Sequence, residues 1–285
     1  MIANHPALAS SPVRRDVLTA LPDGITAAHP ATVVPARFSL EEGVLRVGEA
    51  TYETAAYEAV QVIGGGKGAE QVVLALEAIL GDTITGGVVV SLEEAATEYV
   101  TVRQGGHPVP TAAGVQHTQE VLEAAADADA DTLVIGVITG GASALLTAPA
   151  PGLTRGDIAQ TTDQLLRAGA SIHELNAVRK HLSAIKGGRL AERAAPATVA
   201  CIILSDVVGN DLDVIASGPF VPDTTTFAEA AAVIERYAPD APEAVTERLQ
   251  QGRAGVVDAR PSADAPIFDR VPVEVIADGM PATQA

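Results

Sequence analysis

Positive charge is concentrated in one short stretch of this chain, residues 176–190, NAVRKHLSAIKGGRL. The chain has 36 acidic residues against 18 basic ones and only three lysines, yet two lysines and two arginines fall in this stretch. At 100° per residue, a helix would place four polar residues on one arc that borders an apolar arc; they are Asn176, Arg179, Ser183 and Lys186. A guanidinium fork and an ammonium group at the rim of a groove suit a small anion with a carboxylate or phosphate. The alternative is an amphipathic helix whose cationic side chains reach past the core to water.

A second candidate site is the glycine-rich stretch GGGKG, residues 64–68, which follows an apolar run. Glycines let backbone N–H groups approach an anion, so Gly64, Gly65 and Gly66 are candidate nucleotide contacts, and Lys67 supplies a charge. A Walker A loop is excluded because glycine follows the lysine, and only a degenerate dinucleotide pattern is present. The alternative is a tight turn with a solvated lysine.

A third candidate is TGGASALL, residues 139–146, which follows an apolar run and should open a helix. Gly140, Gly141 and Ser143 would then lie at a helix N-terminus, where free N–H groups form a seat for phosphate. The residues around Ser143 do not form the G-x-S-x-G turn of a hydrolase nucleophile. A helix that is simply well capped explains the same pattern.

Carboxylates gather in SDVVGNDLDVIASGP, residues 205–219, after another apolar run. A carboxylate at a strand end can bind Mg²⁺, with water and substrate phosphates as further ligands, or can accept a hydroxyl proton. Asp206 follows the strand directly and is the favoured residue, with Asp211 as a second candidate metal ligand.

The histidines and the single cysteine give fewer candidate site residues. His107, in GGHPVP, is a candidate substrate contact, whereas His117 and His173 lack partners at metal-ligand spacing, so no zinc site is expected. The single cysteine, Cys201, lies in an apolar run and is expected to be a buried packing residue.

Composition narrows the class of protein. A formal charge of -18 repels nucleic acid and anionic membranes, so neither is an expected partner. Three Lys against 15 Arg in an acidic chain resembles proteins of salt-accumulating organisms, and an ordinary acidic protein is the alternative. With no apolar run of about 18 residues and no basic-then-apolar leader, neither a membrane span nor a secretion signal is expected. The expected location is the cytoplasm.

The elements that must position these residues alternate between apolar strands and helices. Strands are expected in AVQVIGGG, GGVVVS, EYVTVRQGG, TLVIGVITGG and TVACIILSDVVG, which are apolar as buried parallel strands are. A helix is expected over roughly residues 13–28, followed by a β-rich pair with a turn near Gly48. Three further helix starts carry the spacing of a cap residue and an acid three positions on: Thr154 with Asp157, Ser171 with Glu174, and Thr226 with Glu229. The tail from about Gly252 is rich in Pro, Asp and Gly, with one candidate strand at VPVEVI.

Five strings together resemble the glycerate 2-kinase family of the MOFRL type, called hydroxypyruvate reductase in older naming. They are GGHPVP, TGGASALL, ELNAVRKHLSAIKGGRLA, ILSDVVGNDLDVIASGP and PDTTTF, in the family's order and with similar spacing. The resemblance runs from about residue 10 to the end. It implies an α/β fold, with a Rossmann-like, mostly parallel sheet and helices on both faces.

The resemblance also implies ATP-dependent phosphorylation of D-glycerate to 2-phosphoglycerate with Mg²⁺. The family's favoured catalytic groups match Lys67, which would neutralise charge on the transferred phosphoryl group, and Asp206, which would act on the glycerate hydroxyl or help to bind the metal. Arg179 and Lys186 would bind the carboxylate or phosphate.

The sequence departs from the family in three places. Asn210 replaces the first Asp of the family's G-D-D, the early loop reads GGGKGA where V-G-K-A is more usual, and TGGAS replaces S-G-G-G-S. We expect residues 1–255 to form the family's large domain and residues 256–285 to be a connector or the start of a C-terminal domain that is otherwise absent. A separately encoded C-terminal domain and a second copy of the chain are the partners left open. A non-catalytic binding or regulatory protein of the same fold and, more distantly, a hydroxypyruvate reductase remain as alternatives.

Overall fold

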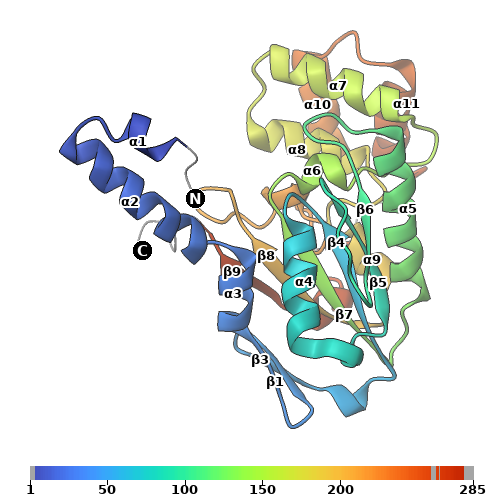
Figure 1. Ribbon diagram of the computed structural model, residues 1–285. Helices are drawn as coiled ribbons and strands as arrows, with labels where there is room; N and C mark the ends of the chain where they lie inside the picture. Colours follow the sequence, from blue (N-terminus) through green and yellow to red (C-terminus); the bar gives the residue numbers. More distant parts are fainter. Residues whose placement is uncertain (1–3, 258–260, 263, 279–285) are drawn as a thin grey trace.

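The structure is a computed structural model that describes residues 4–257, 261, 262 and 264–278 (Figure 1). Its centre is a six-stranded parallel sheet of order β6-β5-β4-β7-β8-β9. The strands are β4 (Ala59–Gly65), β5 (Gly86–Ser91), β6 (Thr101–Gln104), β7 (Thr132–Thr139), β8 (Thr198–Leu204) and β9 (Val273–Ala277). Every residue of the central strand β7 is buried, which explains its uninterrupted apolar sequence. The expected mostly parallel α/β fold is confirmed.

Helices cover both faces of this sheet. On one face, α5 (Ala112–Asp127) and α9 (Arg189–Ala194) pack against side chains such as Ile63 and Val134. On the other, α3 (Pro30–Arg37) and α4 (Ala69–Leu80) pack against Val62 and Ile135. Because neighbouring residues of one strand point to opposite faces, the same two strands supply both cores.

A separate group of helices lies beyond the carboxyl edge of the sheet, at the top of Figure 1. It consists of α7 (Arg155–Arg167), α8 (Ile172–His181), α10 (Phe227–Tyr237) and α11 (Glu243–Arg253), which share a third apolar core. The three expected helix starts are confirmed, because Thr154, Ser171 and Thr226 each form a complete capping box.

The N-terminal part consists of α1 (His5–Leu8), α2 (Pro12–Ala27) and an antiparallel sheet of β1 (Phe38–Glu41), β2 (Val44–Val47) and β3 (Ala50–Glu53). In Figure 1, α2 extends away from the central sheet. The remaining short helices are α6 (Ala142–Leu145) and the 3-10 turns η1 (Thr54–Ala56), η2 (Gly81–Thr83), η3 (Ile215–Ser217) and η4 (Pro266–Arg270). No helix of the described part combines the length and apolar character needed to cross a membrane.

Two local features differ from or extend the sequence interpretation. The helix assumed through Lys186 is wrong at its end, because α8 stops at His181, and Ser183 instead forms a bridge with Pro149. The candidate strand VPVEVI is β9, which pairs with β8 and so places part of residues 256–285 in the main sheet. The division at residue 255 stays a prediction.

Candidate active site

The carboxyl ends of four strands and the start of α3 border a cavity of about 460 Å³, here called the Lys67 pocket. Lys67 follows β4, Gly140 follows β7, Asp206 follows β8 and Asp278 follows β9, while His29 precedes α3. Ligands of open parallel α/β sheets bind outside this edge. The position alone makes the Lys67 pocket the first candidate for an active site.

Lys67 and Asp206 face each other in this pocket, with Lys67 Nζ 3.6 Å from Asp206 Oδ2. Both side chains are partly exposed, at 41% and 57%, so a ligand can reach them. A Cβ atom at Gly140 would lie 2.1 Å from Asp206 Oδ2, so the Asp206 carboxylate occupies the space that a side chain would fill. Two predicted catalytic residues and one predicted nucleotide contact are therefore neighbours.

The backbone of Lys67 is fixed by the neighbouring strand. Its N–H donates to Gly140 O at 2.8 Å, and its carbonyl accepts from Thr139 Oγ1 at 2.9 Å. Gly66 N–H also donates a hydrogen bond, to Val90 O at 3.0 Å. These hydrogen bonds fix the backbone of the loop, so the Lys67 side chain is the group of this loop that can offer a positive charge to a ligand.

Gly64 and Gly65 lie inside β4, between β5 and β7. A side chain at Gly64 would come within 2.0 Å of Val137 O, and one at Gly65 within 2.4 Å of Val90 O. Close packing of strands accounts for these two glycines, and their contact with a nucleotide stays a prediction.

Gly141 lies between Lys67 and His107. A Cβ atom there would be 2.8 Å from Lys67 Cε and 2.9 Å from His107 Cδ2, and the backbone has φ of 82°, which favours glycine. The structure thus brings predicted residues of three separate loops into contact.

A second cavity, of about 260 Å³, lies between the edge of the sheet and the helices beyond it, and is called the Arg179 pocket. Apolar residues of the 108–110 loop and of α7 form part of its lining. Its polar residues include Ser143, Arg179, Ser183 and Lys186, so three predicted substrate contacts meet here. Arg179 and Lys186 give this cavity two cationic side chains, and Asp163 of α7 adds a carboxylate to its lining.

Lys186 is the most perturbed of these groups. Its side chain is buried, with Nζ donating to Leu146 O at 2.9 Å. Burial, together with the nearby charge of Arg179, lowers the pKa of Lys186 to about 7. Burial also lowers the pKa of Arg179. An anion that pairs with Lys186 would stabilise the charged form of its buried amine.

Asn176 is not among the lining residues of either pocket. It is 2% exposed and accepts a hydrogen bond from Ser217 Oγ at 3.0 Å, and Ser217 Oγ lies 3.0 Å from Ser143 Oγ. Asn176 is therefore placed behind Ser143, where it can orient the serine hydroxyl rather than contact a ligand in the cavity.

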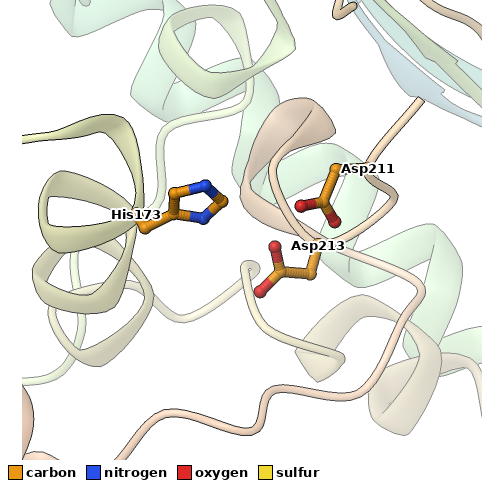
Figure 2. A group of neighbouring side chains, drawn as sticks. All are labelled: His173, Asp211 and Asp213. Carbon is orange, nitrogen blue, oxygen red and sulfur yellow. The ribbon is translucent and has the colours of Figure 1, made fainter. Parts of the chain in front are cut away.

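Asp211 lies apart from Asp206, in a group with His173 and Asp213 (Figure 2). Their potential ligand atoms all lie within 4.8 Å of one another. His173 has no partner at metal-ligand spacing in the sequence, but the fold brings α8 and the loop after β8 together, so two carboxylates lie near its ring. The expectation of no zinc site stays a prediction. The metal role of Asp211 stays a prediction.

The environment of Lys180 was not predicted from the sequence. This lysine is 1% exposed and pairs with Asp213 at 2.6 Å and with Asp223 at 3.3 Å. It ties α8 to the loop that follows β8, so part of the positive charge of residues 176–190 is used inside the fold. The polar arc of Asn176, Arg179, Ser183 and Lys186 did not indicate these ion pairs, because Lys180 lies outside that arc.

Asp278 is a further pocket residue that was not predicted, although its position after a candidate strand was a signal for it. Asp278 lies two residues after the candidate strand VPVEVI, as Asp206 lies two residues after β8. Its Oδ2 accepts a hydrogen bond from Asn210 Nδ2 at 2.8 Å.

Comparison with known proteins shows the family of the chain. Residues 16–250 match the family model described as Domain of unknown function (DUF4147). The D-glycerate 2-kinase of Thermotoga maritima is 40% identical over 195 residues, which cover 67% of this chain and 47% of that protein. A putative hydroxypyruvate reductase of Agrobacterium vitis is 41% identical over 193 residues, covering 67% of this chain and 44% of that protein.

A solved structure shows the same fold. The crystal structure of a protein from Pyrococcus horikoshii OT3 superposes with a TM-score of 0.85 at 33% identity, covering 96% of this chain and 62% of that one. The chain spans about half the length of the curated relatives it matches. It belongs to the DUF4147 family, and within that family it is similar to glycerate 2-kinases.

Proposed function

We propose that this chain serves the ATP-dependent phosphorylation of D-glycerate to 2-phosphoglycerate, with Mg²⁺. The observation that carries the proposal is the Lys67 and Asp206 pair, 3.6 Å apart at the carboxyl edge of the sheet. Phosphoryl transfer needs positioned charges more than a covalent nucleophile, and this pair offers a cation and a carboxylate on rigid elements. The reaction uses cytoplasmic ATP, so we place the protein in the cytoplasm.

The residues of the Lys67 pocket fit a nucleotide with its metal. Bound MgATP supplies the phosphoryl group and a cation that offsets its charge. Lys67 would bind the phosphoryl oxygens, and Asp206 would help to bind the metal and orient the glycerate hydroxyl. The carboxylate oxygens of the pocket are also of the type that Mg²⁺ prefers.

The Arg179 pocket would bind the glycerate. Arg179 offers two parallel donors to a carboxylate, and Lys186 gains a partner for its buried ammonium. Ser143 would line the same site, but its own hydroxyl hydrogen bonds to Ser217 Oγ, because the Ser217 hydroxyl already donates to Asn176 Oδ1. His107 lies between the two pockets, next to Lys67 across Gly141, and would contact the substrate as it reaches the phosphoryl group.

The test is an assay of the purified chain with D-glycerate and MgATP, alone and mixed with the remaining part of a full-length relative. We expect 2-phosphoglycerate, and we expect K67M and D206N each to lower turnover by at least about 100-fold. Asp240→Asn, at an exposed position between α10 and α11, is the matched control.

Three outcomes separate the alternatives. Binding of ATP and D-glycerate without product in either mixture would favour a non-catalytic binding protein. Oxidation of NADH with hydroxypyruvate would favour the reductase named among the relatives. Full turnover in both K67M and D206N would remove the observation on which the proposal rests.

A further inference from the structure

Two carboxylates leave neighbouring strands at the same edge of the sheet. β8 and β9 run parallel with Leu204 opposite Ala277, and Ser205 N–H donates to Ala277 O at 2.8 Å. Asp206 and Asp278 follow these residues within two positions, and both line the Lys67 pocket. The strand register therefore brings the two carboxylates to one cavity.

Each carboxylate is held by a contact of its own. Asp206 lies over Gly140, in the space that a Cβ atom would occupy, and faces Lys67. Asp278 accepts the hydrogen bond from Asn210, which joins the loop after β8 to the end of β9. Asn210 has φ of 52°, a conformation that asparagine tolerates better than most residues. An amide at this position orients a carboxylate without adding a second negative charge beside it.

We propose that Asp206 and Asp278 together bind the divalent cation that accompanies the nucleotide, and that Asn210 is the positioning residue for Asp278. This rests on the proposed function, which places the nucleotide in the Lys67 pocket. Mg²⁺ is commonly bound by one or two carboxylates, with water and phosphate oxygens completing its shell. Two carboxylates beside one lysine leave the pocket with an excess negative charge, which favours a cation before the nucleotide arrives.

The group of His173, Asp211 and Asp213 is the competing location. Neither His173 nor Asp211 lines the Lys67 pocket, and Asp213 is already paired with Lys180. An imidazole ligand suits zinc or other transition metals better than Mg²⁺. This group is therefore the less suitable place for the cation of MgATP.

The test uses Mn²⁺ as the probe, because loss of its free-ion signal in electron paramagnetic resonance reports binding without any turnover. The full chain is titrated with and without a non-hydrolysable ATP analogue. We expect D278N and D206N each to weaken Mn²⁺ binding at least about tenfold, and Asn210→Ala to weaken it about tenfold, with unchanged melting temperature. Asn210→Asp, which puts a third carboxylate beside Asp278, should bind Mn²⁺ more tightly than Asn210→Ala. Asp240→Asn should match the unmodified chain.

The proposal is overturned if D278N and D206N bind Mn²⁺ as the unmodified chain does, or if H173A and D211N alone abolish binding. If D278N does not fold, Mn²⁺ binding by D206N and Asn210→Ala provides the same test. The Mn²⁺ titration contains no D-glycerate, so it tests the metal site separately from the reaction. If D278N loses Mn²⁺ binding while neither the unmodified chain nor any variant shows kinase activity, the metal site is retained and the proposed reaction is rejected.

Discussion

Lys186 combines burial, a neighbouring cation and a position in a ligand-sized cavity. With its pKa lowered to about 7, it is partly uncharged at neutral pH in the free protein. Pairing with a carboxylate or phosphate favours the charged form, so binding above about pH 7 must take up a proton.

The affinity for D-glycerate should therefore fall as the pH rises from about 7 to about 9, by up to about tenfold per unit. Calorimetry in two buffers of different ionisation enthalpy measures both the affinity and the proton uptake. K186M should bind more weakly at pH 7 and lose this pH dependence. Equal affinity across the range in the unmodified chain would remove Lys186 from the binding site.

The same group also affects stability. Its pKa is lowered in the folded protein from an ordinary value of 10.5, so the unfolded chain binds more protons between about pH 7 and pH 10.5. The contribution of Lys186 to the free energy of unfolding should rise across that window and be constant below it. Urea unfolding at several pH values, compared with K186M, checks the sign: a contribution that falls with rising pH would contradict the pKa shift.

At the residue scale, types and spacing predicted much of the candidate site. Lys67 and Asp206 were singled out because they follow apolar strands, and parallel strands share a carboxyl edge. Their contact, and that of His107 with Gly141, depends on which strands are neighbours in the sheet, which no local pattern contains. Asp278 shows the limit, because its strand was recognised but not its place beside β8.

At the scale of elements, the ion pairs of Lys180 connect α8 to the loop after β8. Asp223 is fully buried at its side chain, and Asp213 is 35% exposed. Removing the lysine leaves a buried carboxylate without this cation, which is costly because the interior solvates charge poorly.

K180M should lower the free energy of unfolding by about 3 to 5 kcal/mol. R167M is a matched control, since Arg167 pairs with Asp163 on the surface of α7, and it should cost less than about 1 kcal/mol. Urea unfolding compares the two. Equal stability of both variants would mean that the Lys180 pairs do not hold this loop.

Element boundaries were predicted where a local signal exists. The three capping boxes marked helix starts correctly because their hydrogen bonds lie within four residues. The end of α8 was not predicted, since the chain leaves the helix to pair Ser183 with Pro149, a partner 34 positions away in sequence. The apolar and polar arcs nevertheless named residues that line one cavity, because the turn after α8 keeps Ser183 and Lys186 beside Arg179.

At the scale of the whole molecule, the formal charge of -18 acts on stability. Like charges on the surface repel each other more in the folded state than in the expanded chain. Salt screens this repulsion, because the Debye length falls from about 10 Å at 0.1 M to about 3 Å at 1 M. We expect the melting temperature to rise between about 0.1 M and about 1 M KCl, with activity retained. A melting temperature that is flat or falls over this range would contradict the interpretation as a protein adapted to salt.

The central claim is that nucleotide phosphates bind beside Lys67, and the three lysines of the chain allow a direct measurement. An acyl phosphate anhydride of ATP transfers its acyl group to a lysine amine near the phosphates, forming an amide and releasing ATP. After brief labelling with Mg²⁺, peptide mass spectrometry should find the acyl group on Lys67, and excess ATP should prevent it. Labelling of Lys186 in place of Lys67, with the same protection by ATP, would place the nucleotide in the Arg179 pocket and contradict the account.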